Sequence, residues 1–99
     1  MRLVYTKPVV DRIAEIEDYF TLQSSAKKAE ELIARLLSQA YTLLDHPFRG
    51  MPEKYMEHRG KGHRSLIVDR YKVIYYVEDD AVHITDFFDM KQHRSRMRG

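Results

Sequence analysis

The fold of this chain is decided by residues 63–99, HRSLIVDRYKVIYYVEDDAVHITDFFDMKQHRSRMRG. Three short apolar runs, at about 63–69, 71–78 and 81–88, follow one another with turn residues between them. Runs of this length that are rich in valine, isoleucine and aromatic residues are typical of β-strands. The stretch therefore predicts three consecutive strands of a small antiparallel sheet, followed by a basic tail.

The run at 71–78 is expected to form the central strand. Its apolar side chains occupy both alternating sets of positions, with Val73, Tyr75 and Val77 on one face and Ile74 and Tyr76 on the other. A strand that is apolar on both faces is typically covered on both sides. We therefore expect Tyr75 to pack in the core rather than to lie exposed, where its ring could stack on bases.

The last strand, at about 81–88, follows a tight hairpin turn at Asp79-Asp80. Along this strand Val82, Ile84 and Phe88 recur at even spacings, which predicts that they share one apolar face.

The N-terminal half predicts one strand and a helical hairpin. The segment at residues 2–6 is short and contains β-branched residues, which indicates a first strand. A helix is expected at about 8–22, because apolar residues recur there every three or four positions. A second helix with a wide apolar stripe should end before His46-Pro47. The short connection predicts that the two helices pair antiparallel over residues 8–45.

The segment at 46–62 is rich in proline and glycine, so we expect a loop with a short strand near Lys54–His58. The predicted order of elements is β-α-α-β-β-β. The fold class is therefore α+β, with a helix hairpin packed on a small antiparallel sheet. With 99 residues, of which 43% are hydrophobic, we expect a single domain over residues 1–99.

The composition excludes several classes of protein. The chain has no cysteine, so it has neither disulfides nor thiolate metal ligands, and a reducing cytoplasm suits it. We expect no signal peptide and no membrane span, because no apolar run has the required length. We also expect no cofactor. The histidines are too scattered for a metal signature, so we expect no metal site.

The positive charge is concentrated in the tail at 91–98, KQHRSRMR. The formal net charge is +2, and the excess of basic over acidic residues lies in residues 59–99. Close charges add their fields within a Debye length of about 8–10 Å. We expect an exposed tail that binds an anionic partner and whose removal spares the fold. The predicted nucleic-acid or partner-binding residues are Lys61, Lys91, Arg94, Arg96 and Arg98.

The order of elements and several segments resemble the RelE/ParE superfamily of toxins from type II toxin–antitoxin systems, over about residues 3–97. The segments are PVVDRIAEIEDYF, HPFRGMP and DRYKVIYYVEDDAVHI. The most specific is Tyr71-Lys72-Val73-Ile74-Tyr75, which resembles the Y-R-[IV]-x-Y strand of the superfamily. The resemblance implies a growth-inhibiting protein that is made together with an antitoxin partner, as on plasmid-stabilisation modules.

The resemblance leaves three functions open. RelE-like members cleave messenger RNA on the ribosome, ParE-like members bind DNA gyrase and are not enzymes, and some relatives have no assigned target. RNA cleavage needs a base, a cation that stabilises the phosphorane, and an acid. The resemblance and the chemistry together give Arg64, Lys72 and His93 as the candidate catalytic residues.

Two departures from the superfamily pattern weaken the prediction of a nuclease. Lys72 replaces the usual arginine and cannot grip a phosphate through two parallel hydrogen bonds. Met97 stands near the place of a tyrosine that transfers a proton in many nuclease members, which leaves His93 as the nearest titratable group. The helical hairpin suits a binding surface, so the gyrase hypothesis is slightly favoured. A relative that has lost its toxicity is the third alternative.

Overall fold

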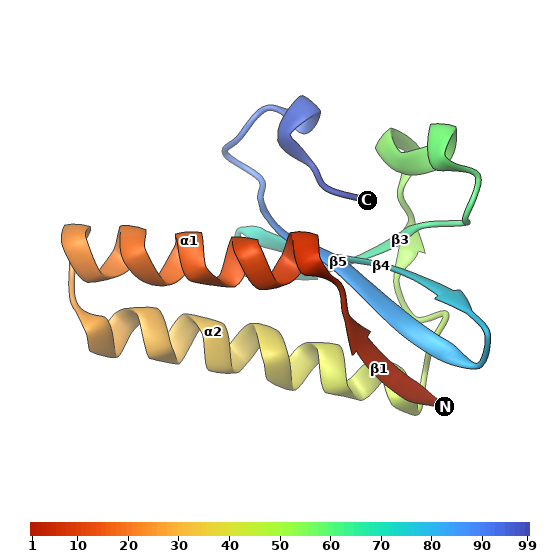
Figure 1. Cartoon of the computed structure of the whole chain (residues 1–99), viewed down its shortest axis with the longest axis horizontal. Coiled ribbons are helices and arrows are strands. Elements are labelled where there is room, and N and C mark those ends of the chain that lie inside the picture. The colour runs from red at the N-terminus through yellow and green to blue at the C-terminus, as the bar shows by residue number, and fades with distance from the viewer.

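The computed structural model describes all 99 residues and contains a helical hairpin packed on one five-stranded sheet (Figure 1). This arrangement confirms the predicted α+β fold and its order of elements. The strands and helices are β1 (Arg2–Tyr5), α1 (Lys7–Gln23), α2 (Ala26–Tyr41), β2 (Met51–Pro52), β3 (Arg64–Val68), β4 (Tyr71–Glu78) and β5 (Ala81–Asp89). Three short 3₁₀ helices, η1 (Thr42–Leu44), η2 (Lys54–Arg59) and η3 (Arg94–Arg96), lie between and after them.

The strands lie in the order β1-β5-β4-β3-β2, so β4 is the central strand, as predicted. The pairs β2–β3, β3–β4 and β4–β5 are antiparallel, whereas β1 runs parallel to β5. The sheet is therefore mixed rather than wholly antiparallel. A tight turn forces neighbouring strands to be antiparallel, but β1 is connected to the other strands through the whole helical hairpin and is not constrained in this way.

The two helices cover one face of the sheet. Ser25 is the N-cap residue of α2, and its side chain accepts a hydrogen bond from the Lys28 N–H (3.2 Å). The apolar stripes of α1 and α2 meet the helix-facing side chains of the sheet in one core. Its fully buried members include Val9, Leu36, Leu43, Val73, Tyr75, Val82, Ile84 and Phe87.

The strand expected near Lys54–His58 is wrong, because the 3₁₀ helix η2 occupies this segment. The Glu53 carboxylate accepts a hydrogen bond from the Tyr55 N–H (3.3 Å) and so begins the helical turn. Gly60 ends η2 in the left-handed region with φ 70°, which favours glycine. The segment's only strand is the two-residue β2, which precedes η2.

The expectation that Ile84 and Phe88 share a face is also wrong. The β4–β5 pairing shifts register between Ile74 and Tyr75, and Thr85 is the extra residue of a β-bulge. The bulge reverses the alternation, so Phe87 joins Ile84 against the helices, whereas Phe88 packs on the opposite face. That second face has its own small core of Met56, Ile74, Phe88 and Met97.

Replacing Tyr75 with phenylalanine should lower the free energy of unfolding by about 1–2 kcal/mol. The Tyr75 hydroxyl is fully buried and accepts a hydrogen bond from the Gly50 N–H at 2.8 Å, so its loss leaves that donor without a partner. Urea unfolding measures the change. The half-buried Tyr76, whose hydroxyl makes no hydrogen bond to protein, provides the control, and Tyr76→Phe should be nearly neutral. Equal effects of the two changes would contradict the role given to the Tyr75 hydroxyl.

Candidate functional site

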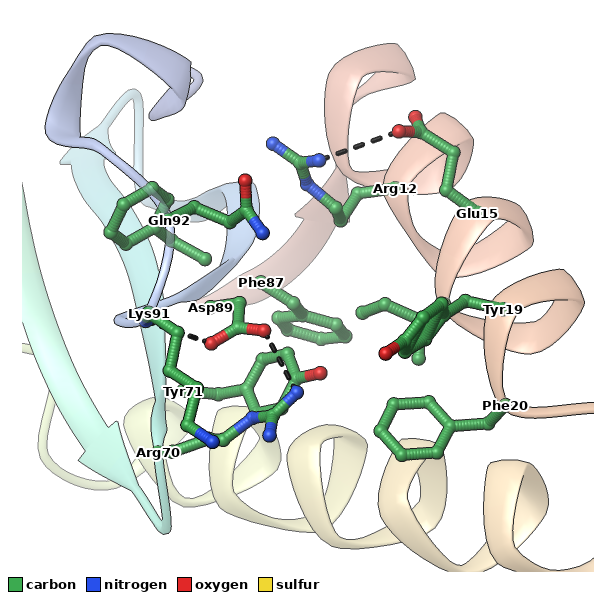
Figure 2. A pocket seen from close by; sticks show the side chains of 12 residues that line it. Arg12, Glu15, Tyr19, Phe20, Arg70, Tyr71, Phe87, Asp89, Lys91 and Gln92 are labelled. Atoms are coloured by element: carbon green, nitrogen blue, oxygen red, sulfur yellow. Dashed lines mark hydrogen bonds and ion pairs between the residues drawn. The ribbon is translucent and has the colours of Figure 1, made fainter. Parts of the chain in front are cut away.

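A groove of about 340 Å³ lies between α1 and the adjoining ends of β4 and β5. Figure 2 shows the rings of Tyr19 and Phe20 on α1 facing those of Tyr71 and Phe87 from the sheet. Charged side chains lie on both sides of the groove. A cavity that combines rings with a few charged groups is typical of a binding site. Its main lining residues are Tyr19, Phe20, Tyr71, Phe87, Arg70, Asp89 and Lys91.

The charges of this groove are partly neutralised by an internal ion pair. Arg70 Nη2 donates to Asp89 Oδ2 at 2.9 Å. Desolvation opposes the charged form of Arg70, but its hydrogen bond with Tyr71 and the charge of Asp89 outweigh this and raise the pKa of Arg70. Burial raises the pKa of the Tyr71 hydroxyl, which therefore stays protonated at neutral pH. Lys91 is exposed and forms no ion pair, so it remains available to a ligand.

Large apolar side chains are exposed on both helices of the hairpin, and those of α1 adjoin this groove. On α1, Tyr19 is 53% exposed and Leu22 is 83% exposed, and residues three apart are neighbours on a helix surface. On α2, Leu37 and Tyr41 are also exposed, four residues apart, but they lie toward the other end of the hairpin. Clustered exposed apolar side chains mark surfaces that bind other proteins.

The structure does not bring Arg64 and Lys72 together. Arg64 pairs with Tyr75 across β3 and β4, and paired residues point to the same face of a sheet, here the helix side. Lys72 lies three positions before Tyr75 on β4 and therefore points to the opposite face. Arg64 Nη1 donates to the Gly50 carbonyl oxygen at 2.7 Å, beside the ring of Phe48. The two cations therefore lie on opposite faces of the sheet in this structure.

Lys72 is held by a buried carboxylate. Its Nζ donates to Glu53 Oε1 at 2.8 Å, and the Glu53 side chain is only 2% exposed. Desolvation favours the neutral acid, but the hydrogen bonds from Lys72 and the Tyr55 N–H, with the Lys72 charge, lower the pKa of Glu53 overall. The ion pair stabilises η2 against the sheet, so Lys72 has a structural partner in place of a substrate phosphate.

His93 and the other predicted binding residues lie at separate places. The His93 ring accepts a hydrogen bond from the Ser95 N–H (3.1 Å) at the start of η3. Lys61 lies over the Tyr76 ring near the end of β4, whereas Lys91 lies near its beginning. An eight-residue strand spans about 25 Å. Arg94 stacks over Tyr55 on the side of the sheet away from the helices, so these cations form no single patch.

The tail is docked and not free, contrary to the expectation from its sequence. Met97 is 7% exposed in the second core, and Thr85 Oγ1 donates to the Arg98 carbonyl oxygen at 2.9 Å. Arg98 also forms an ion pair with Glu15 at 2.8 Å. Its guanidinium, which was predicted to bind a partner, is therefore already paired within the chain. Arg96 is exposed, but its carbonyl oxygen accepts a hydrogen bond from Arg12 (3.0 Å). Figure 1 shows the tail returning over the beginning of α1.

Sequence analysis missed Tyr19 and Leu22 as site residues. A signal was present for Tyr19 and Leu22, because neither belongs to the stripe of Val9, Ile16 and their neighbours that forms the buried face of α1.

Comparisons with known proteins identify the class to which this fold belongs. The model of a family described as "ParE toxin of type II toxin-antitoxin system, parDE" matches residues 3–94. The chain therefore belongs to the ParE toxin family and is a toxin of the type II toxin–antitoxin class. No helix of the structure has the length and apolar character needed to cross a membrane.

A solved structure titled "Chromosomal ParDE TA system from P. aeruginosa" is similar in fold. The TM-score is 0.76 and the sequence identity is 17%, over 90% of this chain and 95% of that chain. At this level of identity the likeness shows the shared fold and not a shared site. Comparison with curated proteins finds no match.

Proposed function

We propose that this toxin inhibits growth by binding DNA gyrase, without catalysing a reaction itself, and that an antitoxin partner neutralises it. Membership of the ParE family supports the proposal, because ParE-like members of the superfamily bind gyrase. The exposed apolar side chains beside the α1 groove provide a surface that suits a protein target.

The observation that carries the proposal is the separation of Arg64 from Lys72, two of the three candidate catalytic residues. RNA cleavage needs a base, an acid and a cation within hydrogen-bond reach of one phosphodiester. Arg64 and Lys72 point to opposite faces of the sheet, and Lys72 is paired with Glu53. One ring nitrogen of His93, Nδ1, accepts a hydrogen bond from the Ser95 N–H at the start of η3. A binding mechanism requires none of these groups to converge.

Two assays with the purified protein distinguish the candidate functions. The protein should inhibit supercoiling of relaxed plasmid by gyrase and should leave messenger RNA intact in a translating cell-free extract. Messenger that is cut at the ribosome, with normal supercoiling, would replace this proposal with the nuclease function. A chain that changes neither assay and is harmless when expressed would be a relative without toxicity.

Replacing Tyr19 with alanine should weaken inhibition of gyrase about tenfold or more, which corresponds to a loss of about 1.4 kcal/mol or more in binding. Tyr19 is 53% exposed, so its removal takes a large ring from the proposed contact surface without opening the core. The concentration that halves supercoiling measures the effect. The exposed Lys27 on α2 provides the control, and Lys27→Ala should be neutral. Unchanged inhibition by Tyr19→Ala would place the gyrase contact elsewhere.

A further inference from the structure

The outer edge of β3 is only partly covered. β3 runs over Arg64–Val68, but its outer neighbour β2 pairs with it at two positions, Met51 with Ser65 and Pro52 with Arg64. The edge beyond Ser65 has no strand beside it, because β2 is the last strand of the sheet on this side. Uncovered edges offer backbone donors and acceptors to another chain.

The alternation of the strand identifies the residue whose backbone faces outward. In an antiparallel pair, every second residue directs both its N–H and its C=O to the same neighbour. His63 and Ser65 face β2, since the His63 carbonyl oxygen accepts from the Glu53 N–H (2.9 Å) and Ser65 pairs with Met51. The next outward residue is therefore Ile67. The Ile67 side chain is 65% exposed. Uncovered edges usually carry charged residues or proline, so an exposed isoleucine at this position is unusual.

Two recesses flank this edge. One, of about 400 Å³, is lined by residues that include Tyr55, Leu66 and Ile67. The other, of about 420 Å³, lies between α2 and the end of β3 and is lined by residues that include Ser38 and Val68. Side chains of an added strand alternate between the two faces of the sheet, so each recess can receive residues from the same extended segment.

The charge around the edge is positive. The two recesses contain four basic residues and two acidic ones: Arg35, Arg49, Lys54 and Lys72 against Asp69 and Glu53. Both acidic residues are already paired, Asp69 with Arg35 at 3.0 Å and Glu53 with Lys72 at 2.8 Å. Arg49 and Lys54 form no ion pair with protein. An approaching segment therefore meets uncompensated positive charge, which favours carboxylates over further basic residues.

We propose that an extended, acidic segment of the antitoxin adds to the sheet as a strand beside Leu66–Val68, with hydrogen bonds to the N–H and C=O of Ile67. The strand would continue the line of β2 and place aliphatic side chains in the two recesses. This inference rests on the antitoxin partnership proposed above, and it does not depend on gyrase as the target.

Amide hydrogen exchange at Ile67 tests the proposal directly. In the free protein the Ile67 amide should exchange much faster than those of Leu66 and Val68, which bond to β4. In the complex with the antitoxin encoded beside this chain, exchange at Ile67 should slow at least tenfold. A complex in which the Ile67 amide exchanges as fast as in the free protein would overturn the proposal.

Two substitutions at Ile67 measure the contribution of the edge to affinity. Ile67→Pro removes the outward donor, which an edge strand tolerates, and Ile67→Glu places a like charge opposite an acidic segment. Each should weaken antitoxin binding at least tenfold in titration calorimetry, whereas the control Ile67→Thr keeps the donor and the branched shape and should change binding less than threefold. Ile67→Glu keeps the test valid if the proline variant fails to fold.

The outcomes separate this inference from the proposals on which it rests. An antitoxin that does not bind the wild-type chain at all contradicts the partnership itself. Tight binding that is insensitive to Ile67→Pro and Ile67→Glu contradicts only the added strand. Protection of Ile67 that rises with the concentration of the free protein would assign the edge to a second copy of this chain and would likewise overturn the proposal. Inhibition of gyrase by Ile67→Glu should equal that of the wild type.

Discussion

Replacing Asp86 with alanine should lower the free energy of unfolding by about 3 kcal/mol, the lower end of the range for breaking a buried ion pair. The Asp86 carboxylate is fully buried and accepts from Arg12 Nε at 2.8 Å and from the Arg98 N–H at 3.0 Å. Its removal leaves the Arg12 guanidinium, only 17% exposed, without its main partner. The lower end applies because Arg12 keeps a weaker contact with Glu15 at 3.4 Å.

The matched control for Asp86 is Asp11→Ala, which removes an exposed carboxylate on α1 that pairs with Lys7 at 3.2 Å. Exposed pairs at this spacing contribute about 0.3–0.5 kcal/mol, so this variant should unfold at nearly the wild-type urea concentration. A second variant, Arg12→Met with Asp86→Leu, removes both charges together and should recover part of the stability. If Asp86→Ala cost no more than Asp11→Ala, the buried pair would not join α1, β5 and the tail as we infer.

The elements of the fold that depend on local periodicity could be predicted from the sequence. The alternation on both faces of 71–78 identified the central strand, because only a strand buried on both sides needs it. The parallel pairing of β1 and the bulge at Thr85 could not be predicted, because both depend on which strands meet. Phe87 and Phe88 are neighbours and therefore point to opposite faces of β5. The sequence pattern alone could not show which of the two rings faces the helices.

The candidate catalytic residues were less predictable than the fold for a geometric reason. Whether Arg64 and Lys72 share a face depends on the length of the turn between their strands. The turn contains two residues, Asp69 and Arg70, and this places Arg64 opposite Tyr75 instead of on the face of Lys72. Sequence analysis expected β3 to continue through residue 69 and assigned no register. The tail presented a similar problem, because Met97 is a single apolar residue among arginines and no periodicity marks it as buried.

Removing residues 96–99 should lower the free energy of unfolding by about 4 kcal/mol. Burial of the Met97 side chain contributes about 1.5–3 kcal/mol. Each hydrogen bond lost with Arg98, from Thr85 and to Asp86, adds about 1 kcal/mol. The deletion also exposes Met56, Ile74 and Phe88 to water. Since domains of this size are stable by about 5–15 kcal/mol, the truncated chain should be folded only marginally, and its urea midpoint should fall sharply.

Two further variants separate the burial of the tail from its charge. Met97→Leu keeps the apolar volume and should cost less than about 1.5 kcal/mol, whereas Lys91→Ala removes an exposed cation and should leave stability unchanged. Lys91→Ala tests the groove instead, where a loss of gyrase inhibition without a loss of stability would indicate a direct contact. If the truncated chain unfolded at the same urea concentration as the full chain, the tail would be the free cationic arm that its sequence predicts. Its arginines would then be available to an anionic partner, because the contacts of Arg98 with Glu15 and Asp86 would contribute nothing to the folded state.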